Sequence, residues 1–290
     1  MKKKRRIGCF GKFLITLLII AVPVVIIIID SNTRLVTTEY ELEFDNLPAA
    51  FDGFRIVLLA DLHGAEHGDD NERLIEQVSA ANPDIIAIAG DLVDKYQPAK
   101  PVEKQVEIAQ TLLRQLVQIA PVYYVTGNHD WEPEVRLPLL TMLEDSDVDL
   151  LRNHYRRLSS TGNGNIILAG IDDPHGPADM VKPGEFIDRI HQREHVDFIV
   201  VLAHRNYNLK LFSELEVDLV LSGHAHGGMV RLPFTDGLIG PQHDFFPTHT
   251  SGVYTQGNTV MVVSRGLGNH LGWTRFLNNP QVVVVELRAA

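Results

Sequence analysis

The chain has 290 residues, of which 45% are hydrophobic and 22% are charged, and its formal net charge is −11. Six of its 26 basic residues lie in the first twelve positions, so the remainder carries 20 basic against 37 acidic residues, a net charge of −17. This acidity argues against a nucleic-acid groove, which needs a basic stripe, and a single cysteine excludes an intrachain disulfide.

An uncharged apolar segment lies close to the N-terminus. Residues 13–29 contain no charged side chain, and as a helix they span roughly 26 Å, against ~30 Å for a bilayer core. Lys2–Arg6 and Lys12 precede the segment and Asp30 follows it, so the positive-inside rule predicts a cytoplasmic N-terminus and an exported domain. A cleaved signal peptide is the alternative, but no small-x-small site follows the segment before Asp30.

These features divide the chain into four parts. We expect a basic cytoplasmic tail at 1–12, a single-pass signal-anchor in the cell membrane at 13–29, a tether with a first strand at 30–52, and one folded domain at 53–290. The length of this last part suits a single α/β domain.

Periodicity predicts strands and helices along the rest of the chain. Residues 33–47 alternate in the manner of an edge strand. Short apolar runs predict strands at 56–60, 85–89, 122–125, 165–170, 198–202 and 219–222. Helical spacing of apolar residues predicts helices at 70–81, 106–116, 136–143, 181–191 and 209–215. Beyond Gly228 the pattern is all-β, with strands at 229–232, 253–254, 260–264 and 282–287.

Five polar segments each follow one of the apolar runs. They are Asp61-Leu62-His63, Gly90-Asp91, Gly127-Asn128-His129-Asp130, Ala203-His204 and Gly223-His224-Ala225-His226. In an α/β sheet, ligand sites lie beyond the carboxyl ends of the strands, so five such ends can converge on one cleft. Carboxylate, amide and imidazole groups gathered there predict a metal centre.

The order and spacing of these segments resemble those of a known family. Asp-x-His, Gly-Asp-x-x-Asp, Gly-Asn-His-Asp and Gly-His-x-His resemble the calcineurin-like metallophosphoesterase superfamily from about Phe54 to the C-terminus. The resemblance implies a four-layer α/β fold in which helices flank two facing mixed β-sheets. It also implies two divalent metal ions roughly 3.5–4 Å apart, which supply hydroxide and neutralise the ester.

By the same resemblance, Asp91 matches the carboxylate that bridges the two ions. The other matching ligands are Asp61, His63 and His226 for the first ion and Asn128, His204 and His224 for the second. Mixed imidazole, amide and carboxylate ligands suit Mn, Fe, Zn or Co better than Ca or Mg, and we favour Mn.

His129 matches a residue that stabilises charge or gives a proton to the leaving oxygen. Asp130 beside it is expected to orient the imidazole and raise its pKa, so both count as catalytic candidates. Asp94 is either an outer partner of this site or a solvated carboxylate at the start of a helix.

The C-terminal quarter resembles the membrane-associated YkuE/YaeI-like phosphodiesterase branch of the superfamily. The residues that carry this resemblance are Gly223–Gly228, Arg231-Leu232-Pro233, Ser264–Gly268, Arg275-Phe276 and Asn279-Pro280. The chain departs from the usual pattern at Met229, Gln281 and Arg205-Asn206, where the branch usually has Asn-Pro. These departures bear on substrate preference and leave the predicted ligands intact.

The resemblance implies an enzyme that hydrolyses a phosphodiester or pyrophosphate bond by attack of a metal-bridged hydroxide. Because of the anchor, a lipid or nucleotide-lipid is a candidate substrate, the membrane is an expected partner, and nucleic acid is not. The alternatives are a phosphomonoesterase or protein phosphatase of the same fold, or a non-catalytic interaction module. The presence of every expected ligand and of His129 argues against the last.

The remaining histidines and one arginine receive separate expectations. His67 could reach the substrate, but we expect it to be exposed in a loop. We expect His270 to lie at the surface, while His175 is either a surface residue or part of the rim of the site. Arg265 either holds a phosphate or forms an ion pair that supports the sheet.

Overall fold

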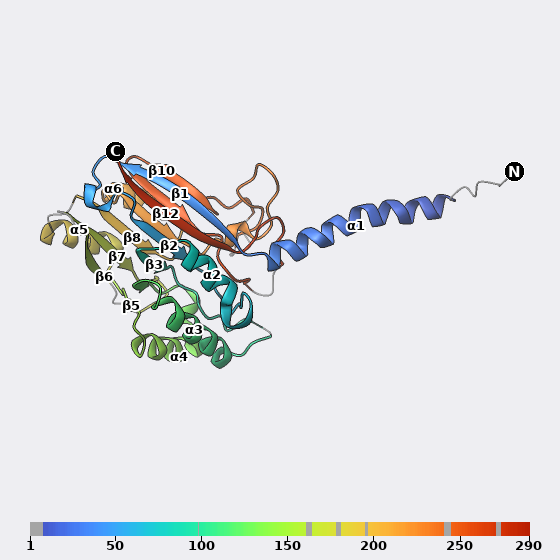
Figure 1. Cartoon of the computed structure of the whole chain (residues 1–290), viewed down its shortest axis with the longest axis horizontal. Helices are drawn as coiled ribbons and strands as arrows, with labels where there is room; N and C mark the ends of the chain where they lie inside the picture. The colour runs from blue at the N-terminus through green and yellow to red at the C-terminus, as the bar shows by residue number, and fades with distance from the viewer. Residues whose placement is uncertain are drawn as a thin grey trace.

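The N-terminal helix stands apart from the body of the protein. The computed structural model describes residues 8–97, 99–160, 164–177, 181–194, 197–240, 245–270 and 274–290. Helix α1 (Cys9–Thr33) extends away from the domain and has an exposed apolar surface (Figure 1). Its 25 residues span about 37 Å, and among the described helices it is the one long and apolar enough to cross a membrane.

The domain contains two six-stranded mixed sheets (Figure 1). The first sheet has the order β1 (Val36–Phe44), β12 (Gln281–Ala289), β2 (Arg55–Leu59), β3 (Ile85–Ile88), β4 (Val122–Tyr124) and β5 (Asp149–Leu150). The second has the order β10 (Gly252–Gln256), β11 (Thr259–Val263), β9 (Leu219–Ser222), β8 (Ile199–Ala203), β7 (Asn165–Ile171) and β6 (His154–Ser159). Each sheet combines parallel pairs with antiparallel ones, of which β12/β2 and β6/β7 are examples.

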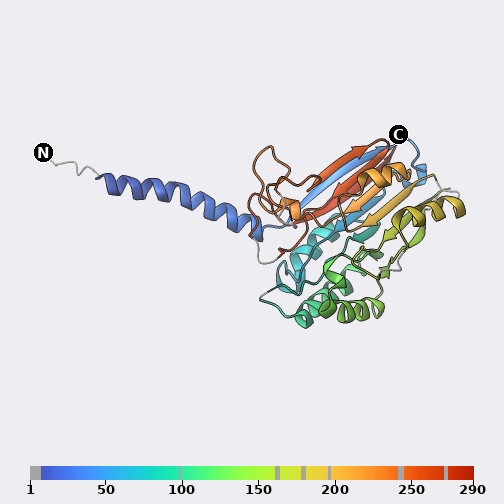
Figure 2. The same ribbon diagram turned by 180° about the vertical axis from the view of Figure 1, so that it is seen from behind.

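Helices cover the outer faces of both sheets. The helices are α2 (Glu72–Ala80), α3 (Val102–Leu116), α4 (Pro133–Glu144), α5 (Pro183–Arg193) and α6 (Leu209–Glu214). Short 3-10 turns lie at Ala49–Phe51, Asp69–Asn71, His129–Trp131 and His226–Gly228. The result is the predicted four-layer arrangement, helices–sheet–sheet–helices (Figure 2).

Strand β2 explains why the sequence has continuous apolar runs. Its Ile56 and Leu58 pack between the sheets, in one cluster with Val200 of β8. Its Val57 and Leu59 point the other way and pack with residues of α2 and α3. A strand covered on both faces needs apolar side chains at every position, so its sequence shows a run rather than an alternation.

Most of the predicted elements are confirmed. β1 lies at the edge of the first sheet, as predicted, and it pairs with β12 from the other end of the chain. Three strands differ from the prediction. The predicted strand at 229–232 is wrong, because this segment makes only an isolated bridge between Val230 and Phe276. β5 and β6 were not predicted. β6 is an edge strand rich in polar side chains, so its sequence lacks a clear alternation of apolar and polar residues.

Candidate metal centre

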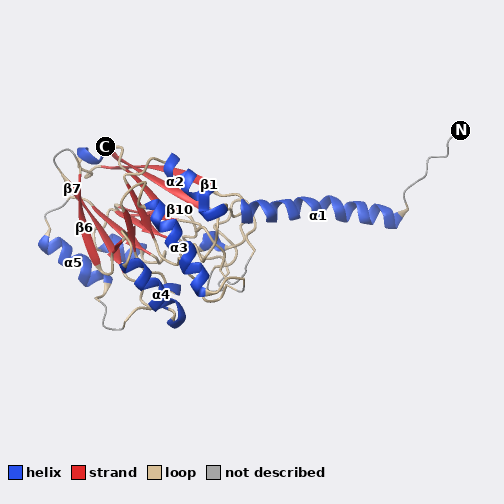
Figure 3. Ribbon diagram, turned by 60° about the horizontal axis from the view of Figure 1, so that its bottom comes forward, coloured by secondary structure: helices blue, strands red, loops and turns tan. Residues whose placement is uncertain are grey.

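The loops that follow β2, β3, β4, β8 and β9 meet at one end of the two sheets. β2, β3 and β4 are parallel neighbours, as are β8 and β9, so within each set the carboxyl ends lie at one edge. His204 Nδ1 donates to Ala89 O at 2.6 Å, and His224 N donates to Asp61 Oδ2 at 3.0 Å. The two edges are therefore in contact. Figure 3 shows loops gathered at the end of the sheets from which α1 leaves.

The backbone at this end is strained. Asp61, His63, Asp91, His224 and His226 have φ values of 52°, 46°, 57°, 68° and 47°. Non-glycine residues rarely adopt positive φ, and such strain concentrates at functional sites. Five of the seven predicted ligands thus share an unfavourable backbone conformation that the surrounding packing must maintain.

One group of side chains combines Asp61, His63 and His226. All three are buried, and one ligand atom from each lies within 4.8 Å of the others. His226 Nε2 lies 3.6 Å from Asp61 Oδ1, and His63 Nε2 lies 4.0 Å from the same oxygen. This group could hold a metal ion. Its three side chains are those predicted for the first ion, to which Asp91 was expected to be the bridging ligand.

A second group combines Asp91, His204 and His224, which are also buried. His204 Nε2 lies 3.2 Å from Asp91 Oδ2, 3.1 Å from His224 Nδ1 and 3.1 Å from Asn128 Oδ1. Because His204 Nδ1 donates to Ala89 O, Nε2 is the nitrogen that faces the group and would bind a metal once it loses its proton. Asp91 Oδ2 also lies 3.8 Å from His63 Nε2, so this carboxylate stands between the two groups.

The chemistry of these groups fits cations. His63 Nε2 and His226 Nδ1 are buried and have no hydrogen-bond partner among the described residues, although buried polar atoms are normally paired. Burial lowers the pKa of His226 and His224 well below the ordinary value, which keeps both imidazoles neutral and able to bind a metal. Burial opposes protonation of His204, but the Asp91 carboxylate outweighs it and raises the His204 pKa to about 10. A field that favours a proton at this point also favours a metal cation.

Asp94 is the centre of a third cluster. Its side chain is buried; Oδ1 lies 3.3 Å from His129 Nδ1, and Oδ2 lies 3.3 Å from both His63 Nδ1 and His270 Nδ1. Burial raises the pKa of Asp94, but contact with His129, His270 and His63 outweighs it and holds the pKa far below its usual range. The alternative of a solvated carboxylate is therefore wrong.

Asp130 does not orient His129 as predicted. Its Oδ2 accepts hydrogen bonds from Tyr124 Oη at 2.5 Å, Gly127 N at 2.7 Å and Asp91 N at 3.0 Å. Burial and the nearby Asp91 carboxylate raise its pKa to about 7. Instead, Asp94 faces the His129 ring, while Asp130 holds the backbone of two neighbouring loops in place. Adjacency in sequence did not predict the contact, because the Asp130 carboxylate is taken up by Tyr124 and by two backbone amides.

Two further histidines lie where they were not expected. His270 is 9% exposed and belongs to the Asp94 cluster, and His67 is 4% exposed with Nε2 3.0 Å from Leu267 O. Both surface predictions are wrong. His175 is exposed at the rim of the site, where its Nδ1 lies 3.1 Å from Asp173 Oδ1. Arg265 forms no salt bridge with the described residues, and its buried Nε has no partner there.

Arg205 was singled out only as a departure from a family pattern, and it lies in the site. Its Nε donates to Asp173 Oδ2 at 2.6 Å, NH1 lies 3.0 Å from His224 Nε2, and NH2 lies 2.9 Å from His175 Nδ1. It lines a cavity of about 180 Å³ together with Asp91, Asn128, His129, His175, His224, His226 and His270. It also lines an adjoining cavity of about 200 Å³ between β7, β8 and the start of α5. Arg205 is thus a buried cation in the wall of both cavities.

Comparisons with known proteins agree with this geometry. The family model described as calcineurin-like phosphoesterase matches residues 54–228. The chain is 29% identical over 255 residues to the uncharacterized metallophosphoesterase YkuE of Bacillus subtilis, covering 87% of this chain and 85% of that protein. It is 28% identical over 298 residues to a Danio rerio transmembrane protein with metallophosphoesterase domain, covering 98% of this chain and 64% of that protein.

Among solved structures, the NAD nucleotidase of Haemophilus influenzae has a similar fold, with a TM-score of 0.50 at 12% sequence identity. The match covers 73% of this chain and 45% of that one. With the family match spanning more than half of the chain, the resemblance predicted from the motifs is confirmed. The chain belongs to the calcineurin-like phosphoesterase family and is a phosphoester hydrolase.

Proposed function

We propose that the chain is a membrane-anchored phosphoesterase that hydrolyses a phosphodiester or pyrophosphate bond with two divalent metal ions. The observation that carries this proposal is the position of Asp91, whose Oδ2 lies 3.8 Å from His63 Nε2 and 3.2 Å from His204 Nε2. One carboxylate between two ligand groups suits a pair of ions. Such ions supply hydroxide near neutral pH and neutralise the ester, and Mn is the first candidate.

His129 serves the leaving oxygen. Burial opposes its protonation, but the carboxylates of Asp91 and Asp94 outweigh burial and raise its pKa to about 9, so it carries a proton at neutral pH. Asp94 Oδ1, 3.3 Å from His129 Nδ1, orients the ring and leaves Nε2 free for a leaving group. Asp130 contributes by holding the loop that carries Asn128 and His129.

Arg205 binds the phosphate. Its guanidinium lines the cavity beside His129 and His224 and is fixed by Asp173. A planar guanidinium can contact two phosphate oxygens at once. The adjoining cavity, with Ile171, Val181 and three prolines in its wall, offers an apolar site for the group that the ester carries.

The anchor holds the catalytic end of the domain near the bilayer. Asn269, next to His270 of the cavity, donates from Nδ2 to Asn32 Oδ1 in the last turn of α1 at 2.9 Å. This contact supports a catalytic end close to the membrane, which favours a lipid or nucleotide-lipid substrate. The basic residues before the apolar segment support a cytoplasmic N-terminus, with the catalytic domain on the other side.

Turnover is tested on the full-length protein in detergent, with one divalent metal supplied at a time. The substrates are bis(nitrophenyl) phosphate, nitrophenyl phosphate and a lipid-linked pyrophosphate, with Asp91→Asn as the control. We expect metal-dependent hydrolysis of the diester or the pyrophosphate and its loss in the control. Turnover of the monoester alone would indicate a phosphomonoesterase, and metal binding without any turnover would indicate an interaction module.

Topology is tested with fusions after Ala290. Alkaline phosphatase fused there should be active, and a fluorescent protein that folds only in the cytoplasm should stay dark. The opposite pair of results would place the catalytic domain in the cytoplasm.

A further inference from the structure

Exposed apolar side chains are concentrated in one part of the domain. Outside α1, nine large hydrophobic residues of the described chain are exposed, and five of them lie in the segments 232–246 and 277. Phe234 is fully exposed, Phe245 is 75% exposed and Phe246 is 70% exposed. We call these three, with Leu232 and Leu277, the aromatic patch. Exposed apolar side chains that gather in one region mark an interaction site, whereas single ones are common on soluble surfaces.

Backbone contacts join the segments that carry the patch. Phe276, next to Leu277, forms a bridge with Val230, and Arg231 N donates to Phe276 O at 2.9 Å. Leu238 N donates to Val230 O at 2.8 Å, and Phe246 N donates to Leu238 O at 3.1 Å. The described segments that carry the patch are therefore joined to one another by backbone hydrogen bonds.

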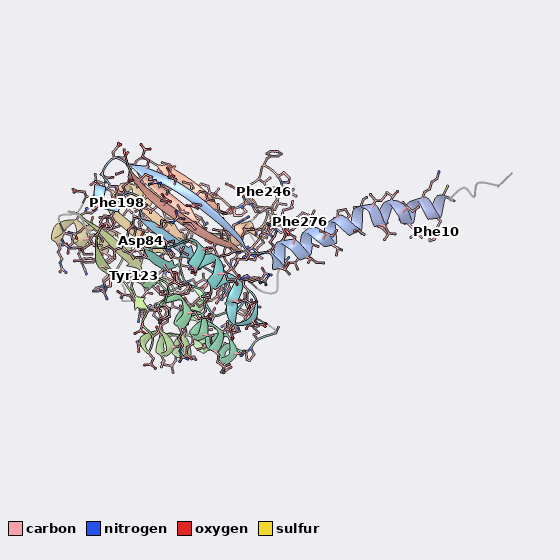
Figure 4. All side chains as sticks on the ribbon, in the orientation of Figure 1. Phe10, Asp84, Tyr123, Phe198, Phe246 and Phe276 are labelled. Atoms are coloured by element: carbon pink, nitrogen blue, oxygen red, sulfur yellow. The ribbon has the colours of Figure 1, made fainter. Side chains whose placement is uncertain are left out.

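The same group of segments is attached to the end of α1. Asn32 Nδ2 donates to Arg275 O at 2.9 Å, and Arg275 N donates back to Asn32 Oδ1 at 3.0 Å. Asn279 Nδ2 donates to Asp30 O at 2.8 Å. These bonds flank Phe276 and Leu277 on both sides. Figure 4 labels Phe246 and Phe276 at the end of the domain from which α1 leaves, and Figures 1 and 2 show the orange loops there beside the base of the helix.

We propose that the aromatic patch inserts into the headgroup region of the same bilayer that α1 crosses. This inference rests on the membrane anchoring proposed above. The apolar segment ends at Ile29, so Asn32 and the residues bonded to it lie at the level of the bilayer surface. Aromatic side chains held at that level enter the interface without crossing the hydrocarbon core. The bilayer is the occupant that the structure favours, because the patch adjoins the point where the chain enters it.

A second membrane contact has a consequence for the site. A single helix can tilt in the bilayer and carry the attached domain with it, whereas a second membrane contact limits that tilt. His270 of the cavity follows Asn269, which is bonded to Asn32, so a limited tilt holds the cavity near the lipid headgroups. A lipid-linked ester then reaches the metal groups without leaving the membrane.

Environment-sensitive labels test the proposal on the full-length chain. Cys9 is replaced by Ser, and single cysteines labelled with nitrobenzoxadiazole are introduced by Phe234→Cys, Phe246→Cys, Leu137→Cys and Ile20→Cys. Leu137 on α4 is the matched control, since it is 72% exposed and distant from α1. Ile20 reports on the anchor itself. Each variant is reconstituted into phosphatidylcholine–phosphatidylglycerol vesicles with or without lipids that carry a nitroxide near the headgroup.

We expect the labels at Phe234 and Phe246 to be blue-shifted and to lose fluorescence in nitroxide vesicles, while the label at Leu137 does neither. If the Ile20 label is buried in lipid but the patch labels behave like Leu137, the anchor is real and this inference is wrong. Patch labels shielded from a water-soluble quencher but unaffected by nitroxide lipids would indicate a covering protein, and would also overturn it. A water-exposed Ile20 label would refute the anchoring itself.

Discussion

Replacing Asp94 by Asn tests how His129 is held, because the substitution keeps the shape of the side chain and removes its charge. Asp94 Oδ1 faces His129, and Oδ2 faces His63 and His270, each at 3.3 Å. Asn offers one acceptor oxygen and one NH₂ donor. Either His129 or the pair His63 and His270 therefore loses its acceptor.

The size of the effect follows from this geometry. Asp94 and His129 form an ion pair at 3.3 Å; if it tightens into a hydrogen bond to a charged group during turnover, it contributes about 1.5–3 kcal/mol, which corresponds to a loss of rate of roughly 10- to 150-fold. His129→Ala removes the whole acid, for which we expect a loss of rate of roughly 10²–10⁴-fold. The rate of Asp94→Asn should thus lie between that of the native enzyme and that of His129→Ala. If bound metal is unchanged, so that the His63 contact plays no part, the double variant should be no slower than His129→Ala alone, because Asp94 and His129 then act as a unit.

The pH profile should also change. Burial works against protonation of His129, but the Asp91 and Asp94 carboxylates outweigh it and raise the pKa to about 9. A group with a raised pKa keeps its proton below that pKa and loses it above. Removing one carboxylate lowers the pKa, so the alkaline limb of kcat/KM should move to lower pH in Asp94→Asn.

The assay is kcat/KM on aryl diesters whose leaving groups differ in basicity, with bound metal counted by elemental analysis. The loss should be greatest for the poorest leaving groups. Asp218→Asn is the control, because this carboxylate lies before β9, at the far end of the sheets, and bonds to Asn46 and Ile199 N. Native activity in Asp94→Asn, or a double variant slowed by both full factors at unchanged bound metal, would refute the pairing with His129.

Three further predictions follow from the site. Asp91→Asn should lower both turnover and bound metal, and more than Asp61→Asn does, because Asp91 stands between two ligand groups; two metals per chain at full activity would exclude a bridging role. Arg205→Gln should raise KM for a phosphate ester more than Arg205→Lys does, since Lys keeps the charge; equal KM values for the two variants and the native enzyme would remove Arg205 from substrate binding. Gly90→Ala should lower the Tm, because Gly90 has φ +80° and an added Cβ would lie 2.4 Å from Gly127 N; positive φ alone costs about 1–3 kcal/mol, so an unchanged Tm would show that the loop can relax.

The strands that carry the site and the helix at the N-terminus could be predicted from the sequence alone. β2, β3, β8 and β9 are covered on both faces, so their apolar runs are local signals that need no knowledge of the neighbours. Polar residues that directly follow such a run lie at the end of a strand, because the run marks where the strand stops. The charge-free segment 13–29 is likewise readable from composition, and it lies within α1.

The partners of His129 and the order of the strands could not be predicted in this way, because they depend on the folded chain. Asp94 and His270 are 176 residues apart in the chain, and β1 pairs with β12 from the opposite end of the domain. Asp130 is next to His129 in sequence and yet bonds to Tyr124 and to the backbone of Asp91. Which polar side chain faces which depends on contacts between distant segments and on turn geometry, and neither leaves a periodic trace in the sequence. The attachment of the aromatic patch to Asn32 is known for the same reason only from the fold.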